Sequence, residues 1–488
     1  MNTRRLGACL LIAVLMIASY SARAYAASLN AASCASSDVQ AVLTSCSNDV
    51  LCDTVQIPPC SATWSTPVVM NANAKSKSLK LIGSGDNTII TAAVGDALKI
   101  SGMSGMSWRV SQMKFVGGAG NSIIKIDGSS TNWRLDHITF DSGGGAGSLI
   151  GVGSKTYGVI DHCTASGSVS EFVNVRDDNW NGWMTTQSFG DANAVYVENN
   201  TIDWTGACWI GRPAVDGDRG ARVVFRHNKV WNARIGGHGF DTGGGAGFQS
   251  LEVYNNEFHY TRTGSGCPVW DYLSGVRSGT SVWYNNNWDI ATDVEITNIN
   301  IILRDYRAEA AVPDSNTWGV CDGTHYMMCS NIDKNWKFLG GSTVNDCVEG
   351  NNAKCNVGYT CKWKFCSGNR MRLCDPTNVN GRDYDCTNGG HGNEGTCTDY
   401  VDGTGPGGYP CRMQNGYSTN MIASPVYAWN NTYTGSSNYG PSGSVKIRAY
   451  ASQIKENLDY FNAIKPGYTP YRYPHPLADP SVPKIRLN

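Results

Sequence analysis

The chain repeats one short phrase, which reads Trp108-Arg-Val, Trp133-Arg-Leu, Tyr157-Gly-Val, Ala194-Val-Tyr-Val, Ala221-Arg-Val-Val, Ser250-Leu-Glu-Val and Ser281-Val-Trp. Successive copies begin 24 to 31 residues apart, except for a longer step into Ala194. From the fourth copy on, each phrase leads into a polar Asn-x-apolar corner, at Asn200, Asn228, Asn256 and Asn286. A period of this length indicates one structural coil per repeat, stacked on its neighbours.

Each repeat holds alternating β-branched or aromatic residues, then Asn or His, then a second apolar run and a loop rich in Gly, Asp and Ser. Such a unit cannot bury its apolar side alone, so neighbouring units must stack and pair their strands in parallel. Asn suits the corners because it tolerates left-handed backbone and can bond the Asn of the next coil. The sequence therefore predicts an all-β protein, a right-handed parallel β-helix from about Leu79 to Ile302. A β-propeller is the alternative, but its blades need about 40 to 45 residues, and a β-sandwich would not repeat one phrase in register.

The first 26 residues have the three regions of a secretory signal peptide. Met1-Asn-Thr-Arg-Arg is basic, residues 10–18 are apolar, and Ala24-Tyr-Ala26 ends the segment with small residues. The apolar run is too short for a membrane anchor. We expect cleavage after Ala26 and a secreted protein, located outside the cell or on its surface.

The chain has 18 cysteines, and all but Cys9 follow the predicted cleavage site. Ten of them crowd into residues 321–411. This number favours disulfides in an oxidising compartment, whereas zinc, the competing interpretation, would need paired C-x-x-C motifs and more nearby histidines. The mature count is odd, so one thiol is free or pairs between chains. Cys163 is the strongest candidate for a buried free thiol, because it follows a core-facing phrase.

The repeats and cysteines divide the chain into five predicted parts. These are the signal peptide 1–26, an N-terminal cap 27–77, the β-helix 78–318, a disulfide-rich insertion 319–411, and a final coil with a C-terminal tail 412–488. A cap is expected because the open edge of a coil stack invites strand addition. The periodicity returns at Val426-Tyr-Ala-Trp-Asn-Asn-Thr, and the Pro- and Tyr-rich tail from Lys465 is expected to pack along the outside of the stack.

The formal net charge is −1, and only 16% of the residues are charged. No basic stripe predicts nucleic-acid binding, and no second apolar run predicts a membrane span. The many Trp, Tyr, Asn and Gly residues suit an extracellular surface that binds sugars. The expected partner is an extracellular polysaccharide, and the odd cysteine is also compatible with self-association.

One phrase, Gly158-Val-Ile-Asp-His-Cys-Thr, resembles the W-I-D-H-C phrase of pectate lyases, although the Trp is missing. Other phrases resemble a set of secreted bacterial β-helix proteins, among them Gly220-Ala-Arg-Val-Val-Phe-Arg-His-Asn228 and Lys465-Pro-Gly-Tyr-Thr-Pro-Tyr-Arg-Tyr-Pro-His-Pro476. The resemblance implies the pectate-lyase-like superfamily of right-handed β-helices. It implies no particular reaction, because one fold hosts many functions.

Four consecutive coils carry long loops, at residues 176–191, 208–222, 231–247 and 261–277. They leave the same phase of the repeat, so we expect them to rise together as the walls of a groove. The candidate active-site residues of this region are Arg226, His227, Arg234, His238 and Asp241, with Glu198 one coil earlier.

These residue types suit a lyase that cleaves a uronate-containing glycan by β-elimination. Such an enzyme neutralises the substrate carboxylate and then removes the C5 proton with a base. We predict that Arg234 or Arg226 holds the carboxylate and that His238 is the base. The predicted substrate-binding residues are Glu198, His227, Asp241, Trp209 and Arg212, and Asp216 and Asp218 are candidate Ca²⁺ ligands. The alternative is structural: Arg226 and His227 would line a corner, and the Asp/Gly segments would be ordinary turns.

Two other functions stay open. A glycoside hydrolase needs two carboxylates around the scissile bond. Asp177-Asp178 and Gly237-His-Gly239 resemble motifs of polygalacturonase-like hydrolases, but they are separated by about two coils and depart from the order of that pattern. A non-catalytic adhesin, carbohydrate-binding protein or filament subunit is the other possibility, since the tryptophans near the loops (Trp180, Trp183, Trp204, Trp209 and Trp231) would also serve passive sugar binding.

Overall fold

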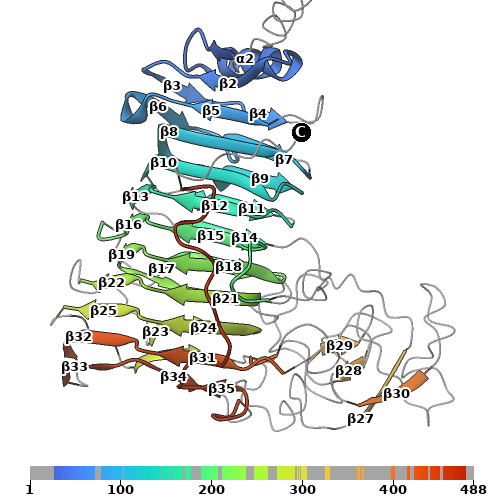
Figure 1. The fold of residues 1–488 in the computed structure, drawn as a ribbon, viewed down its shortest axis with the longest axis vertical. Helices are drawn as coiled ribbons and strands as arrows, with labels where there is room; N and C mark the ends of the chain where they lie inside the picture. The colour runs from blue at the N-terminus through green and yellow to red at the C-terminus, as the bar shows by residue number, and fades with distance from the viewer. Residues whose placement is uncertain are drawn as a thin grey trace, which may run out of the picture.

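The computed structural model describes residues 27–71, 78–102, 104–143, 146–153, 155–167, 171–176, 188–206, 212–237, 247–261, 272–291, 294, 296, 298–304, 325–329, 360–362, 365–367, 397–401, 415–417, 423–437, 440–450 and 454–479. The predicted signal peptide lies outside these residues. Strands of successive coils pair in parallel and form a three-sided β-helix (Figure 1). The predicted parallel β-helix is therefore confirmed.

Face 1 carries the repeated phrase. Its strands are β1 (Ala27–Asn30), β2 (Cys52–Gln56), β5 (Leu79–Ile82), β8 (Ser107–Gly117), β10 (Asn132–Ser142), β12 (Gly158–Asp161), β15 (Val195–Glu198), β18 (Ala221–Arg226), β21 (Phe248–Tyr254), β24 (Thr280–Tyr284), β31 (Val426–Trp429) and β35 (Tyr460–Phe461).

Face 2 follows the bend after face 1, and β8 and β10 are long enough to run through that bend. Its other strands are β3 (Cys60–Trp64), β6 (Thr88–Ala92), β13 (Thr164–Gly167), β16 (Thr201–Asp203), β19 (Lys229–Trp231), β22 (Glu257–Tyr260), β25 (Asn287–Ile290), β32 (Thr432–Ser437) and the antiparallel β33 (Gly440–Ser444).

Face 3 closes each coil. Its strands are β4 (Val68–Asn71), β7 (Leu98–Gly102), β9 (Gly120–Gly128), β11 (Ala146–Gly153), β14 (Val173–Arg176), β17 (Arg212–Asp218) and β20 (Ala233–Ile235), continued by β23 (Tyr272–Val276), β26 (Asn298–Leu303) and β34 (Lys446–Ala449). A 3₁₀ turn, η1 (Gly85–Asn87), precedes β6.

From β8 onward, one residue at the bend between face 1 and face 2 of each coil has a left-handed backbone, with φ between 52° and 58°. These residues are Gln112, His137, His162, Asn199, His227, Asn255, Asn285 and Asn430. Asn, His and Gln occupy this column because short polar side chains tolerate positive φ better than β-branched ones do.

From the bend at Asn199 onward, the residue after each bend is an asparagine, and these residues form the predicted ladder. The side-chain oxygen of Asn228 accepts from the backbone and side-chain nitrogens of Asn200, at 2.9 and 3.0 Å. The same two bonds join Asn228 to Asn256, Asn256 to Asn286, and Asn286 to Asn431 of the final coil. The alignment of the four predicted asparagines is confirmed, and the final coil continues it.

The interior is a stack of apolar side chains that includes the parallel rings of Trp108 and Trp133, 5.2 Å apart. The next coil pairs Trp133 with Gly158 and not with Tyr157, so the phrase is shifted by one residue there. A Cβ on Gly158 would lie 2.3 Å from Trp133 Cδ2, which explains why glycine stands opposite the buried indole. Cys163 is buried and free, as predicted, and burial raises the pKa of its thiol.

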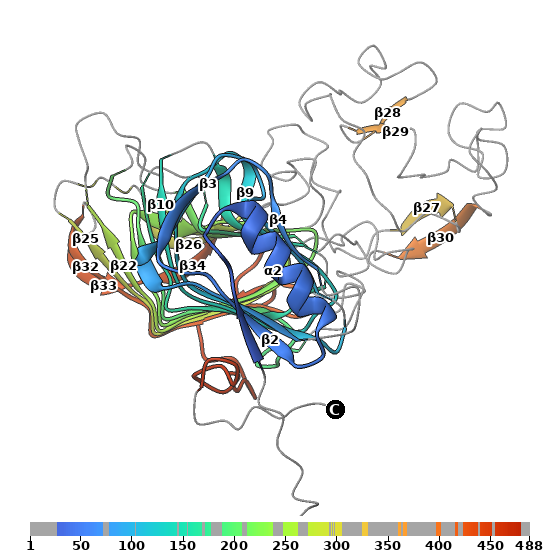
Figure 2. The ribbon, with the colours of Figure 1, turned by 90° about the horizontal axis from the view of Figure 1, so that it is seen from above.

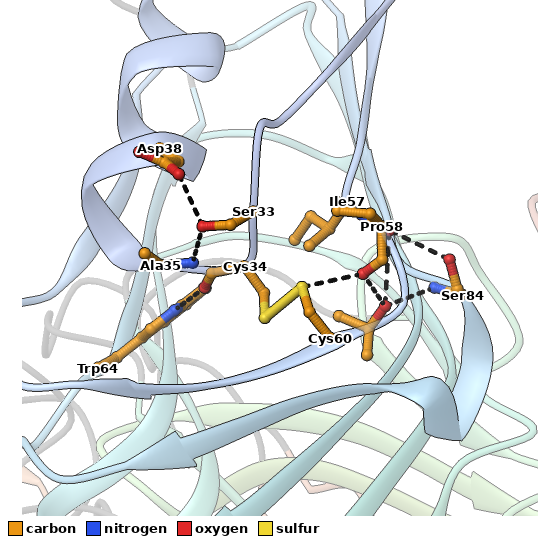
Figure 3. The surroundings of a disulfide bond; sticks show 10 residues. Ser33, Cys34, Ala35, Asp38, Ile57, Pro58, Cys60, Trp64 and Ser84 are labelled. Atoms are coloured by element: carbon orange, nitrogen blue, oxygen red, sulfur yellow. Dashed lines mark hydrogen bonds between the residues drawn. A yellow bond between two sulfur atoms is a disulfide. The ribbon is translucent and has the colours of Figure 1, made fainter.

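The predicted cap contains a helix, α2 (Ser36–Asn48), which lies across the end of the stack (Figure 2). Its buried side chains are Val39, Leu43 and Cys46. Disulfides Cys34–Cys60 and Cys46–Cys52 fasten this layer. Figure 3 shows the first of them, with Trp64 Nε1 donating to the carbonyl of Cys34 at 2.8 Å. Strands β1 to β4 of the same segment already pair with the coils, so the cap is also the first turn of the stack.

Most of the predicted disulfide-rich insertion lies outside the described residues. Two antiparallel strand pairs are described there, β27 (His325–Cys329) with β30 (Cys397–Val401) and β28 (Thr360–Lys362) with β29 (Phe365–Ser367). No helix of the described residues is long and apolar enough to cross a membrane.

After the final coil, the chain turns back and crosses the outside of face 1, as predicted from its composition (Figure 1). We call residues 465–479 the C-terminal strap. Its apolar side chains Tyr468, Tyr471 and Leu477 pack against a layer of outward-facing residues of face 1, which comprises Val159, Ala194, Tyr196, Val224, Tyr254 and Tyr284.

Candidate functional site

The outward side of face 1 carries one column of charged and aromatic residues in register on adjacent strands. From the N-terminal end, the column reads Asp136, Asp161, Glu198, Arg226, Tyr254, Tyr284 and Trp429. We call it the charged column. The side chains of Asp136, Asp161, Glu198 and Arg226 have no exposed surface, so each charge must be compensated by neighbouring groups.

Arginines of face 1 compensate the first two carboxylates. Arg109 bonds both oxygens of Asp136 through Nε and Nη2. Arg134 does the same to Asp161, at 2.8 and 2.7 Å, and its Nε lies 3.4 Å from Asp136. Although burial opposes it, the hydrogen bond from Arg109 and the charge of Arg134 hold the pKa of Asp136 below its ordinary value. Both carboxylates therefore belong to one buried network of ion pairs with Arg109 and Arg134.

Each of these aspartates also bonds the histidine that follows it in the chain. His137 Nδ1 lies 2.7 Å from Asp136 Oδ2, and His162 Nδ1 lies 2.7 Å from Asp161 Oδ2. The two imidazoles are half exposed and stack in parallel, with ring centroids 5.2 Å apart.

The strap covers the middle of the charged column. Arg226 pairs with Glu198 at 2.6 Å and donates to the hydroxyl of Tyr254 and to the carbonyls of Tyr471 and Arg472. The second Glu198 oxygen accepts from the backbone N–H of His475 at 2.8 Å. The Glu198 and Arg226 side chains are thus bonded to other protein groups and have no surface exposed to solvent.

Further contacts hold the strap on both sides of that pair. Tyr468 donates to Glu252, at 2.6 Å, and the ring of Tyr473 stacks on His227 with centroids 3.7 Å apart. Burial and the charge of Arg226 lower the pKa of His227 to about 4. The same two causes lower the pKa of His475 to about 3, and burial raises the pKa of Glu198.

The outward side of face 3 holds a second group of charged residues on three adjacent strands. Asp216 and Asp218 alternate with the core-facing positions of β17, and Arg176 Nε lies 3.3 Å from Asp218 Oδ2 across the β14–β17 pair. Arg234 lies on β20 between the core residues Ala233 and Ile235. Asp216, Asp218 and Arg234 are 1%, 4% and 7% exposed, which is unusual for charged side chains on an outer face.

The predicted site residues therefore separate into two groups. Glu198, Arg226 and His227 lie on or beside face 1, whereas Arg212, Asp216, Asp218 and Arg234 lie on face 3. Arg226 and Arg234 are close in sequence but on different faces, because the chain turns with positive φ at His227 and again at Asn232. Predicted residues His238, Asp241 and Trp209 lie outside the described residues, and His238 follows Gly237, the last described residue after β20, directly in the chain.

The described carboxylates do not by themselves make a calcium site. Ca²⁺ takes about six to eight oxygen ligands. Asp218 is already paired with Arg176, and Asp216 accepts the N–H of Gly217 at 2.9 Å. Within the described ranges, no group of three or more His, Cys, Asp or Glu side chains is placed to hold a metal ion. The calcium prediction for Asp216 and Asp218 stays a prediction.

Sequence reasoning did not single out the Asp–Arg–His network of face 1 as a site. The signal was present, since Asp136-His137 and Asp161-His162 repeat the same dipeptide one coil apart. Of the two dipeptides, Asp161-His162 lies within the phrase that resembles the pectate lyases. Comparison of the chain with protein-family models, curated proteins and solved structures found no match.

Proposed function

We propose that the protein binds a uronate-containing polysaccharide at the outward side of face 3 and cleaves it by β-elimination. The observation that supports this site most strongly is that Asp216, Asp218 and Arg234 are buried on the neighbouring strands β17 and β20, beside the exposed Arg176 of β14, which pairs with Asp218. Buried guanidinium and carboxylate groups on an outer face are an expected feature of a binding site for a charged ligand.

Face 1 is the weaker location for the reaction. Glu198 and Arg226 are fully buried and bonded to the strap, so a glycan would have to displace residues 465–479 to reach them. Arg234 keeps 7% of its surface exposed and Arg226 keeps none, so we take Arg234 as the carboxylate ligand. We keep His238 as the base, because only Gly236 and Gly237 separate it in the chain from the end of β20.

The proposed chemistry follows from these roles. Arg234 pairs with the carboxylate of a uronate and stabilises the negative charge that develops when the C5 proton is removed. His238 takes that proton. The electron pair of the C5–H bond forms the C4–C5 double bond, the C4–O bond to the preceding sugar breaks, and the released oxygen takes a proton from solvent. The resemblance to the pectate-lyase-like superfamily is compatible with this reaction class. None of the proposed steps uses calcium.

The test is an assay of the secreted chain against several uronate-containing polysaccharides and one neutral glucan, with and without added Ca²⁺. Release of an unsaturated product, detected by ultraviolet absorbance, is the expected result. His238→Ala and Arg234→Ala should each lower the rate about a hundredfold or more, and Arg234→Lys should retain more activity than Arg234→Ala. The control is Lys229→Ala, an exposed residue of face 2 whose ion pair with Glu257 is 3.6 Å long.

Other results would assign other functions. Binding without any product would favour the non-catalytic carbohydrate-binding protein or adhesin, and saturated products would favour a glycoside hydrolase. If the chain neither binds nor cleaves any of these glycans, the proposal is overturned. Full activity in both variants would remove Arg234 and His238 from the site.

A further inference from the structure

The repeated dipeptides Asp136-His137 and Asp161-His162 form two equivalent units at the N-terminal end of the charged column, beyond the proposed glycan site. Asp136 and Asp161 are paired residues of β10 and β12, and the histidines occupy the left-handed bend position with φ of 52°. Because both histidines begin from the same backbone geometry, they project in the same direction, and their rings differ in orientation by only 3°.

The hydrogen bonds fix which ring nitrogen carries the proton. Asp136 and Asp161 are fully buried and held in two-pronged ion pairs by Arg109 and Arg134, so each is a carboxylate and accepts hydrogen bonds. The Nδ1 atom of each histidine must then be the donor, and a neutral imidazole keeps its lone pair on Nε2. The side chains of His137 and His162 are 51% and 48% exposed.

The bend itself does not require this arrangement. Asn199, Asn255, Asn285 and Asn430 occupy the same left-handed position in other coils. His227 also occupies it, but Arg226 precedes it, its Nε2 lies 3.3 Å from the amide nitrogen of Asn255, and its ring is covered by Tyr473. An orienting buried carboxylate and an exposed ring occur together at His137 and His162, and not at His227.

We propose that His137 and His162 bind a divalent transition-metal ion, such as Zn²⁺, through their Nε2 atoms. A histidine whose Nδ1–H is held by a carboxylate is the arrangement that metal-binding histidines use, because the carboxylate fixes the tautomer and makes Nε2 more basic. Neutral imidazole suits Zn²⁺, Cu²⁺ and Ni²⁺. Asp136 and Asp161 balance the charges of Arg109 and Arg134, so the network beneath the rings does not repel a cation.

One ion shared by both rings requires the two imidazoles to leave their parallel stack. Zn–N bonds are about 2.0–2.1 Å long, so two nitrogens on one ion lie closer together than the 5.2 Å that separates the ring centroids. The two half-exposed rings would have to tilt toward each other on binding the ion. Water would fill the remaining coordination positions, since the protein supplies two ligands at this place.

The test is a calorimetric titration of the full chain, without a histidine tag, with Zn²⁺. His137→Asn and His162→Asn preserve the bend, because Asn is the residue that other coils use there, so the variants should fold. Each single variant should weaken the binding of one Zn²⁺ ion at least tenfold, and the double variant should lose that ion. His227→Asn makes the same change at a bend where no second histidine stacks on the ring, and it should leave the Zn²⁺ titration unchanged.

Differences between wild type and the double variant separate this site from any other that binds zinc. In crystals soaked with Zn²⁺, an anomalous peak between the two Nε2 atoms is expected for the wild type and not for the double variant. If the wild-type chain takes up no Zn²⁺, or if the double variant binds as many ions with equal affinity, the site does not exist.

Discussion

Asparagine has two different roles at adjacent positions of each bend. In the pair Asn255-Asn256, the first residue takes the left-handed backbone, and the second bonds its neighbours in both directions along the ladder. The sequence predicts which asparagines align, because they recur with the phrase. It does not separate the two roles, since both are filled by the same residue type.

Replacing a ladder residue should destabilise the whole stack. The Asn228 side chain donates to the carbonyls of Val197 and Arg226, at 2.8 and 3.0 Å, and is fully buried. We expect Asn228→Ala to lower the free energy of unfolding by about 3 kcal/mol or more, because several buried polar groups lose partners together. Chemical denaturation measures this change. Asn287→Ala, on the outer side of face 2, should change it by less than about 0.5 kcal/mol; equal effects of the two changes would show that the ladder is not a source of stability.

At the scale of elements, the strap was predictable, but what it covers was not. The Pro- and Tyr-rich composition after Lys465 indicated a segment packed outside the coils, as the structure shows. However, the sequence around Glu198 and Arg226 does not show whether these outward residues face solvent or are covered by another segment. The segment that bonds Arg226 is 245 residues away along the chain, and no local pattern reports such a contact.

Acid should weaken the docking of the strap through His475. The docked strap holds His475 neutral, with its pKa lowered from 6.5 to about 3 by burial and then by Arg226, while Asp161 and Arg134 face it with opposing charges. A lowered pKa means that the stabilising contribution is complete above pH 6.5 and is lost as the pH falls toward 3. His227 acts in the same direction, and the raised pKa values of Glu198 and Glu252 act in the opposite one.

Comparison with His475→Gln isolates this residue, because glutamine does not titrate. Amide hydrogen exchange of the strap, corrected for the intrinsic pH dependence, should increase more in the wild type than in the variant between pH 7 and about pH 4.5. Identical pH profiles of the two proteins would exclude His475 as the group responsible.

The register of the two strand pairs in the insertion predicts two disulfides. Cys361 stands opposite Cys366 in the β28–β29 pair, and Cys329 stands opposite Cys397 in the β27–β30 pair. Opposed residues of antiparallel strands have Cα atoms about 4.5–5.5 Å apart, within the range of disulfides. Peptide mapping under non-reducing conditions should recover both pairs; recovery of these four cysteines mainly as free thiols would contradict the prediction.

In the whole molecule, the charged residues predicted to form one site lie on two different faces of the β-helix. Arg226 and Arg234 are eight residues apart but lie on different faces, and each cluster is formed by residues of successive coils on one face. Hydrophobic periodicity predicted the β-helix because every coil repeats the same inward pattern. It could not predict the sites, because the outward residues differ from coil to coil and their partners come from neighbouring coils or from the C-terminal strap.

We propose that a uronate-containing glycan binds face 3 while the C-terminal strap keeps face 1 covered. The most direct test is amide hydrogen exchange of the full chain, measured with and without oligosaccharides of a uronate-containing polysaccharide that the chain binds or cleaves. Protection should appear in β14, β17 and β20, and the strap and the strands under it should be unchanged. Protection confined to face 1, or faster exchange of residues 465–479 on binding, would contradict it.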